Sequence, residues 1–218
     1  MLLRFARPGT DIWGRCISLV QSRYRSDYGA EIDPDPDLFV MLTAASSVET
    51  AEMAVAGLSF GARDSSLFCE HYLGAAAEDV ATQVTGSDRT VGRDALIEVG
   101  PLASSKAGLG RRMIEVLPGL CWCRGAAAIL FTVTRPVASL IRASGTELHV
   151  VGDARLEALP ADEQPRWGSY YDNEPVVGVV DLARFGAELA VRPSSTSSLS
   201  PVGIVAGPIP EGSVHAAV

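Results

Sequence analysis

The eight residues from Ser105 to Arg112 have the composition of an anion-binding turn. They follow an apolar segment, precede a stretch with helical periodicity and include two glycines. The first N–H groups of a helix have no partner inside the helix, and together with the helix dipole they can bind a phosphate. Lys106, the only lysine among 18 basic residues, adds a compact positive charge. The candidate phosphate-binding residues are Ser105, Lys106, Ala107, Gly108, Leu109, Gly110, Arg111 and Arg112.

Two other interpretations of this turn are open. A Gly-x-Gly pair between a strand and a helix can serve tight packing alone, and a single surface lysine can be solvated without binding a ligand. Short glycine patterns also match by chance. The turn therefore indicates a phosphate site only in combination with other features of the chain.

Glu98 is the candidate general base. It interrupts the apolar segment 95–100. A carboxylate that faces a protein core is normally paired with another group, and burial raises its pKa toward the range that suits proton transfer at neutral pH. The alternatives are that strand alternation points Glu98 into water, or that Arg93 pairs with it.

Neither a metal site nor a covalent nucleophile is predicted. The four cysteines lack Cys-x-x-Cys spacing, and the three histidines are isolated from one another. Cys69, Glu70 and His71 are consecutive, and consecutive residues on a helix point in different directions. Glu70 is therefore interpreted as a structural or substrate-positioning carboxylate.

Length, composition and charge predict one soluble globular domain. The chain has 218 residues, 47% apolar and 20% charged, without an apolar run of the roughly 18 residues that a membrane span needs. The N-terminus lacks the apolar core of a signal peptide, so a cytoplasmic location is expected. The net charge of −8 argues against a broad nucleic-acid surface but leaves a local contact through Lys106, Arg111 and Arg112 open.

Hydrophobic periodicity predicts alternating helices and strands. Helices are expected at about 11–28, 65–84, 109–124 and 135–143, the third bent or shortened by Pro118. Strands are expected at 38–43, 51–62, 95–100, 126–134, 148–151 and 176–181, with the second antiparallel to the first across a turn at Ser46 and Ser47. This order indicates an α/β fold with one mixed sheet. Residues 1–191 form the predicted single domain, and 192–218 form a disordered tail rich in Ser, Pro and Gly.

Several motifs between Gly57 and Leu182 resemble the thermostable-hemolysin family, which is similar in turn to GNAT acyltransferases and acyl-homoserine-lactone synthases. The resemblance implies a GNAT-like fold with a mixed, mostly antiparallel central sheet flanked by helices. The motifs that carry it are Leu67–Leu73, Arg93, Ile97–Gly100, Leu102–Ala103, Phe131–Thr134 and Trp167–Asp172.

In GNAT enzymes, a Gln/Arg-x-x-Gly-x-Gly/Ala loop holds the pyrophosphate of coenzyme A through its amides. Residues 105–110 occupy that place, and Ser105 stands where the family has Gln or Arg. The hemolysin-type motif commonly carries Asn after Glu-Val-Gly, whereas this chain has Pro101. The first departure puts the usual binding of coenzyme A in doubt, and the second removes an amide side chain that could orient the substrate.

The resemblance also implies a reaction. An amine attacks a carrier-bound acyl carbonyl directly, without a covalent acyl-enzyme, and Glu98 accepts the proton. Tyr170 or Tyr171 would protonate the leaving group, the alternative being that both tyrosines and Trp167 only pack the core. The residues assigned to substrate binding are Glu70, Thr132 and Trp167.

Three functions are therefore compared. The first is an N-acyltransferase, in bacterial secondary metabolism, that moves an acyl or aminoacyl group from coenzyme A or an acyl carrier protein to a small-molecule amine. The second is a transferase whose donor is aminoacyl-tRNA, and the third is a membrane-active protein, disfavoured because no basic amphipathic helix is evident. No tightly bound cofactor and no membrane contact are expected, the donor is a cosubstrate, and the protein is a monomer or a homodimer.

Overall fold

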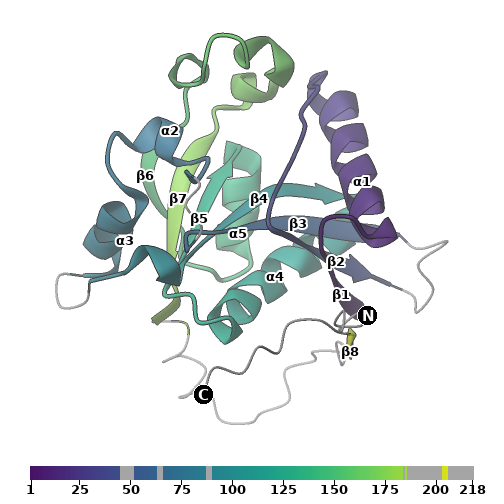
Figure 1. The fold of residues 1–218 in the computed structure, drawn as a ribbon, viewed down its shortest axis with the longest axis horizontal. Helices are drawn as coiled ribbons and strands as arrows, with labels where there is room; N and C mark the ends of the chain where they lie inside the picture. Colours follow the sequence, from purple (N-terminus) through teal and green to yellow (C-terminus); the bar gives the residue numbers. More distant parts are fainter. Residues whose placement is uncertain (45–51, 63–65, 87–89, 184, 186–202, 206–218) are drawn as a thin grey trace, which may run out of the picture.

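One mixed sheet forms the centre of the protein (Figure 1). The computed structural model describes residues 1–44, 52–62, 66–86, 90–183, 185 and 203–205. The sheet order is β6-β7-β5-β4-β3-β2-β1-β8, in which β4 and β5 run parallel, as do β1 and β8, and the other neighbours are antiparallel. The strands are β1 Leu2–Ala6, β2 Leu38–Thr43, β3 Met53–Phe60, β4 Leu96–Ser104, β5 Ala128–Val133, β6 His149–Asp153, β7 Val176–Asp181 and β8 Gly203–Val205.

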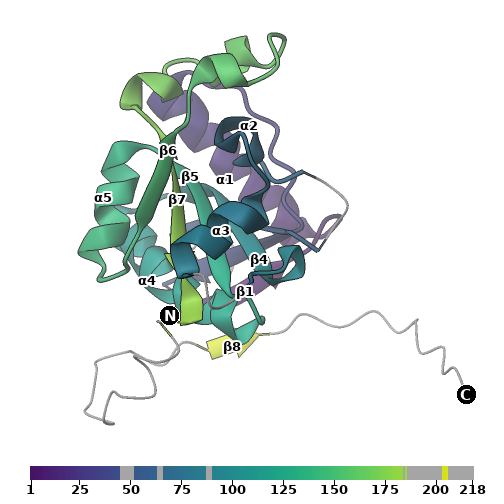
Figure 2. The ribbon, with the colours of Figure 1, turned by 90° about the vertical axis from the view of Figure 1, so that its left-hand side faces the viewer.

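Helices cover both faces of this sheet (Figure 2). On one face, α4 and α5 pack against the largest group of buried apolar residues. On the other face, α1 packs over β1 to β3 around Cys16 and Val20, and α2 and α3 pack over β5 and β7 around Ala77 and Ala81. The helices are α1 Asp11–Tyr28, α2 Glu70–Leu73, α3 Ala77–Thr85, α4 Ala107–Cys123 and α5 Arg135–Ala143, with 3-10 turns at Arg93–Ala95, Leu156–Ala158, Gln164–Trp167 and Tyr170–Asn173.

Local sequence signals explain several of these elements. Thr10 caps α1 by accepting a hydrogen bond from Trp13 N at 3.2 Å, and Gly29 ends the helix in the left-handed conformation with φ 65°. Helix α5 and strands β2 and β7 have the predicted bounds. The antiparallel pairing of β2 with β3 is confirmed, whereas the predicted turn at Ser46 and Ser47 lies outside the described residues. The mixed, mostly antiparallel sheet flanked by helices is therefore confirmed.

Other elements differ from the sequence prediction. The expected helix 65–84 is divided at Gly74, which adopts φ 61°, into α2 and α3. Helix α4 continues through Pro118 to Cys123, so the predicted shortening is wrong; buried Leu117 and Cys121 pack on the sheet on both sides of the proline. Strands β1 and β8 were not predicted, and β8 lies within the tail 192–218, the rest of which is outside the described residues.

Strands β4 and β5 separate part-way along the sheet. Their parallel ladder runs from Leu96 and Ala128 to Val99 and Phe131, although β4 extends to Ser104 and β5 to Val133. The ladder between β3 and β4 shifts register between Ala56 and Leu58, so that β4 contains an extra residue at this point. Beyond Val99, the facing edges of β4 and β5 are thus no longer paired with each other.

Candidate functional site

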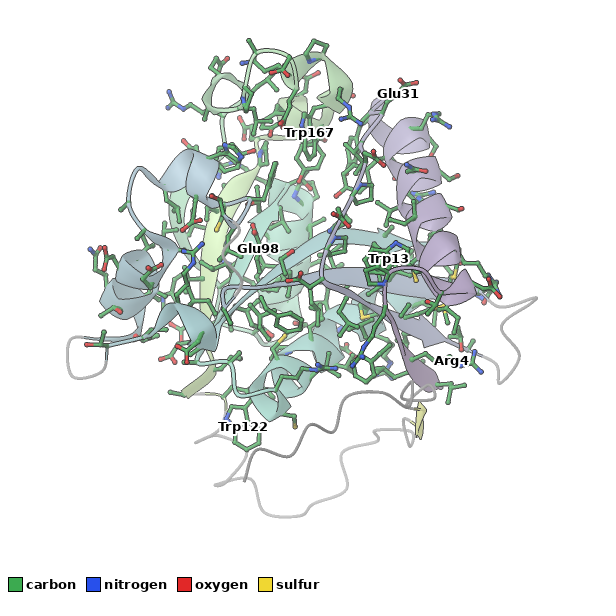
Figure 3. The ribbon with its side chains drawn as sticks, viewed as in Figure 1. Arg4, Trp13, Glu31, Glu98, Trp122 and Trp167 are labelled. Carbon is green, nitrogen blue, oxygen red and sulfur yellow. The ribbon has the colours of Figure 1, made fainter. Side chains whose placement is uncertain are left out.

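Glu98 points to the face of the sheet that α1, α2 and α3 share. Its neighbours Ile97 and Val99 pack in the core on the α4 side, so strand alternation turns Glu98 to the opposite face. It lies there between the apolar group under α1 and the group under α2 and α3, near the middle of the molecule (Figure 3). Only 4% of the residue is exposed. The alternative that Glu98 points into water is therefore wrong.

Main-chain amides hold the Glu98 carboxylate. Oε2 accepts a hydrogen bond from Phe68 N at 2.6 Å, and Oε1 accepts one from Cys69 N at 2.8 Å. Burial nevertheless raises the pKa of Glu98 to about 7, because desolvation outweighs these bonds and that from the Cys69 side chain. A carboxyl group with this pKa exchanges its proton at neutral pH, as a general base must.

Arg93 pairs with Glu70 and not with Glu98. Its guanidinium donates to both Glu70 oxygens, at 2.6 and 2.9 Å, and to Glu78 Oε2 at 3.0 Å. Glu70 also accepts a bond from Leu67 N at 2.8 Å, so it braces the turn whose next amides bind Glu98. The hydrogen bonds from Arg93 hold the pKa of Glu70 at about 2. This placement favours a structural role for Glu70 over contact with substrate.

The Glu70 ion pair predicts a pH-dependent stability. A carboxyl group whose pKa is lower in the folded state stabilises the protein above its unfolded pKa, and this contribution is lost as pH falls toward about 2. We expect Glu70→Gln to lower the free energy of unfolding by about 2 kcal/mol at pH 7 and by much less at pH 3. Urea unfolding at both pH values measures the difference.

Glu78→Gln is the matched control, because Glu78 makes one bond to Arg93 where Glu70 makes two. We expect Glu78→Gln to cost less than half as much as Glu70→Gln. Equal losses for the two variants, or a Glu70→Gln loss that does not change between pH 7 and pH 3, would contradict this account.

A cavity of about 400 Å³ opens beside Glu98. We call it the Glu98 cavity. Residues of β3, β4 and β5 line it from the sheet, and its other walls come from α1, the segment that leads into β2, the turn before α2 with the start of α2, and the 3-10 turns between β6 and β7. The residues that the argument uses are Tyr24, Asp33, Asp35, Phe68, His71, Glu98, Thr132, Glu163, Arg166, Trp167 and Tyr170.

The Trp-Gly-Ser motif closes one side of this cavity. Trp167 lies above Glu98 in Figure 3. Its ring stacks on Phe68 with centroids 5.4 Å apart. Gly168 has φ 51°, and a Cβ there would overlap Tyr28 O, so only glycine fits. Ser169 donates from N, at 2.8 Å, and from Oγ, at 3.1 Å, to the same carbonyl. These contacts fasten the wall to the end of α1 and set the position of Trp167.

The two tyrosines of the motif have different surroundings. Tyr170 is buried, its hydroxyl donates to Thr132 O at 3.4 Å, and desolvation raises its pKa well above the usual range. Tyr171 is hydrogen-bonded to Tyr72 through the two hydroxyls at 2.6 Å, and burial raises its pKa to about 12. Tyr170 lines the Glu98 cavity, whereas Tyr171 lines a separate surface hollow beside β6.

The residues of the predicted glycine turn lie mostly inside α4. Lys106 precedes the first helical residue, so Gly108 and Gly110 belong to the first turn of the helix, and neither has a positive φ. The N–H groups of Leu109 and Gly110 both donate to Lys106 O, at 3.0 and 3.2 Å. Of the candidate phosphate-binding residues, Ala107 and Gly108 therefore keep amides without a hydrogen-bond partner in the described chain, whereas the amide of Gly110 is already bonded.

Polar groups around the start of α4 are already paired. Ser105 Oγ accepts from Met53 N at 2.9 Å and donates to Met53 O, which ties this residue to β3. Lys106 Nζ lies 2.8 Å from a Glu52 carboxylate oxygen in an exposed ion pair. Arg111 and Arg112 both pair with Glu115, at 3.1 and 2.8 Å. Each predicted cation thus has an acidic partner on the surface.

A groove of about 420 Å³ lies where β4 and β5 separate. We call it the strand groove. It is lined by both strand ends, the start of α4, the end of α1 and the inner side of α5, and it shares Tyr24, Val99–Pro101, Thr132 and Tyr170 with the Glu98 cavity. Thr132 Oγ1 is buried at this shared wall and has no hydrogen-bond partner among the described residues. A buried, unpartnered hydroxyl is costly unless a ligand uses it.

The described cysteines are all free, and three of them are buried. Burial raises the pKa of Cys69 far above its usual value, so its thiol is a poor nucleophile. Among the described residues, no group of three or more His, Cys, Asp or Glu side chains is arranged to hold a metal ion. No described helix combines the length and apolar character that crossing a bilayer requires.

A family comparison accounts for most of the chain. The profile of the family described as thermostable hemolysin matches residues 6–185. The chain belongs to the thermostable hemolysin family. This confirms the resemblance carried by the Glu-Val-Gly and Trp-Gly-Ser-Tyr-Tyr motifs. None of the curated proteins compared with the chain matches it.

Several solved structures share the fold of this chain. TofI, solved in a ternary complex with an inhibitor and MTA, has a TM-score of 0.55 and 17% identity over 89% of this chain and 99% of TofI. BjaI, a CoA-dependent acyl-homoserine lactone synthase solved with MTA, has a TM-score of 0.53 and 12% identity over 94% of this chain and 93% of BjaI. The AHL synthase LasI has a TM-score of 0.50 and 9% identity over 83% of this chain and 89% of LasI. These likenesses concern the fold, which is GNAT-like as predicted.

Some residues of the site have no distinct signal in the sequence. Tyr24 reads as one apolar position of the α1 stripe, yet it lines both hollows. Asp33 and Asp35 read as a helix-ending Asp-Pro repeat, yet they stand at the Glu98 cavity. Only the proline pattern, which holds this segment extended, could have marked it as a fixed wall.

Proposed function

We propose that this protein transfers an acyl group from a phosphate-bearing thioester carrier, coenzyme A or an acyl carrier protein, to the amine of a small molecule. The observation that carries the proposal is the meeting of two hollows at one wall. The strand groove and the Glu98 cavity share Thr132, Tyr170 and Val99–Pro101. A donor in the groove and an acceptor in the cavity would therefore meet at the end of the β4–β5 ladder.

The donor arm has a matching surface in the strand groove. Beyond Val99 the facing edges of β4 and β5 carry main-chain N–H and C=O groups that do not pair with each other. An extended arm that contains amide groups, such as pantetheine, can bond to such edges as an added strand does. At the mouth of the groove, Ala107 offers the first amide of α4 to the carrier phosphate, and the amide of the adjacent Gly108 is also without a main-chain partner in the described chain.

The charge around α4 supports an anion at this place. Helix α4, like α5 and unlike α1, α2 and α3, carries no acidic residue in its first turn. No negative side chain of the first turn therefore offsets the partial positive charge at the N-terminus of α4. The three basic residues here form ion pairs with acidic neighbours: Lys106 with Glu52, and Arg111 and Arg112 with Glu115. The positively charged surface is therefore small. This supports a single phosphate contact of coenzyme A or a carrier protein over the broad backbone contact that tRNA needs.

Each bond change in the proposed reaction has a residue beside it. The amine lone pair attacks the acyl carbonyl, a C–N bond forms, and the carbonyl electrons move to oxygen, where Thr132 Oγ1 donates a hydrogen bond. The amine loses a proton to Glu98. The carbonyl re-forms as the C–S bond breaks, and the thiolate takes a proton from Tyr170, which then recovers it from solvent. Tyr171 lines neither the Glu98 cavity nor the strand groove, whereas Tyr170 lines both, so we assign the role of general acid to Tyr170.

A charge placed at Ala107 tests the donor site. Ala107 is exposed and is the first residue of α4, so Ala107→Glu keeps the helix, because an acidic first turn suits the helix dipole. We expect its repulsion of phosphate to weaken coenzyme A binding about tenfold, or about 1.4 kcal/mol, in calorimetric titration. Ala107→Gln, which has the same size without the charge, should bind nearly as the parent does. Equal losses for both variants, or none for Ala107→Glu, would contradict the donor site.

A further inference from the structure

The charges around the Glu98 cavity are strongly unequal. Four carboxyl groups line it, and Arg166 supplies the one guanidinium among the lining residues. In the described part of the chain, no ion pair engages Asp33, Asp35 or Glu163. Their uncompensated charges give the cavity a negative potential, which a hollow between low-dielectric walls concentrates.

Arg166 offsets one of these negative charges, so carboxylates remain in excess around the cavity. Its Nε donates to Glu31 O at 3.1 Å, and Arg166 O accepts from Glu31 N at 2.7 Å, so the residue fastens the 3-10 turn to the segment after α1. The only other titratable base among the lining residues is His71, which packs edge-on against Phe68. An anionic acceptor would find few donors in this cavity.

Aromatic faces form the inner walls. Phe68 and Trp167 stack at 5.4 Å with an interplanar angle of 27°, and Tyr24 and Tyr170 stack at 5.8 Å with an angle of 15°. Aromatic faces carry partial negative charge and attract cations, and they also accept flat apolar groups. Thr132, whose buried Oγ1 has no partner in the described chain, lines the same cavity at the wall where the donor carbonyl would lie.

We infer that the acceptor is a cationic amine with a flat apolar body and without a carboxylate. This inference rests on the acyl transfer proposed above and names the class of acceptor for the same site. The body lies between the aromatic walls, and the carboxylates at the entrance attract the ammonium group. The ammonium releases its first proton to water at the cavity entrance, and the neutral amine then attacks the donor carbonyl and gives its second proton to Glu98.

A matched series of three probes tests the charge preference. Tyramine, tyrosol and 4-hydroxyphenylacetate share a phenol ring on a short chain and carry positive, zero and negative charge. In calorimetric titrations of the full chain, we expect tyramine to bind at least tenfold tighter than tyrosol, and 4-hydroxyphenylacetate to bind weakest. Added salt should reduce the preference for tyramine. Equal affinities, an inverted order, or no saturable tyramine binding would overturn the inference.

Variants connect this preference to the named carboxylates. We expect the double variant Asp33→Asn, Asp35→Asn to bring the tyramine-to-tyrosol ratio close to one, and Glu163→Gln to lower it in part. Asp162→Asn is the control, because Asp162 is exposed and next to Glu163 but does not line the cavity. A control that lowers the ratio as much as the double variant does would overturn the assignment.

Coenzyme A binding separates the two proposals. If coenzyme A binds the strand groove and tyramine shows no preference over tyrosol, the inference about the acceptor fails while acyl transfer stands. If tyramine is preferred and neither coenzyme A nor a loaded carrier protein binds, the proposed function fails while the cation-selective cavity stands.

Discussion

Glu98→Gln is expected to lower kcat for acyl transfer by about 100-fold or more, because the variant cannot accept the amine proton. In the parent protein, kcat should rise with pH through about 7 and then level off, since burial raises the pKa of Glu98 to about 7 and only the ionised form is a base. The variant should lose this inflection. Initial rates of thiol release across pH 5 to 9 (about two units on either side of the pKa) measure both effects.

The fold of this variant needs its own control. Because the pKa of Glu98 is higher in the folded state, the folded protein binds more protons between about 4.5 and 7, and this carboxyl group contributes less stability as pH rises through that window. Gln offers one acceptor to the two amides of Phe68 and Cys69, so a loss of about 1–3 kcal/mol is expected. Coenzyme A affinity should be unchanged. A variant that binds donor and turns over at the parent rate would remove Glu98 from the mechanism.

Thr132→Val is expected to lower kcat by about 100-fold while leaving stability unchanged or slightly higher. Thr132 Oγ1 has no hydrogen-bond partner in the described chain, so replacing the hydroxyl with a methyl group of similar volume removes no bond and relieves the cost of an unsatisfied buried group. If the hydroxyl stabilises negative charge on the carbonyl oxygen, its loss should slow the reaction as loss of an oxyanion donor does. Steady-state kinetics and urea unfolding measure the two effects.

Thr134→Val provides the matched comparison for stability. The Thr134 side chain is hydrogen-bonded to Tyr28, so this variant should lose about 1 kcal/mol, whereas Thr132→Val should not. A Thr132→Val variant that is clearly destabilised would show that the hydroxyl already has a structural partner. One with full activity would show that the hydroxyl does not act on the donor.

The sequence predicts the fold where local signals and burial agree. Helix α1 follows from its cap and apolar stripe, and β2 and β7 follow from uninterrupted apolar runs. Strand β1 is only partly buried and has an arginine inside it, so it lacks the uninterrupted apolar run of a fully buried strand. The extension of β4 past Gly100 also lacks a local signal, because Pro101 reads as a strand end until β3 is seen to pair with Leu102–Ser104.

Some features of the site could also be predicted from the sequence, and others could not. Glu98 was predictable because a carboxylate within an apolar strand needs a physical reason, and the structure supplies it in the amides of Phe68 and Cys69. The pairing of Arg93 with Glu70 depends on a turn of α2 that sequence spacing does not specify. Gly108 and Gly110 were expected in a loop, but Gly110 is needed where α4 packs on Ser104. Contacts between distant segments, which carry no local pattern, account for these differences.

The central claim is that a carrier enters the strand groove and places its reactive end beside Glu98. Titrating coenzyme A into isotope-labelled protein and following the backbone amide signals tests this most directly. We predict saturable changes at Ala107, Gly110, Val137 and Thr132, with none at Glu157, which lines the separate surface hollow beside β6. No saturable change, or changes confined to residues outside the strand groove, would contradict the claim.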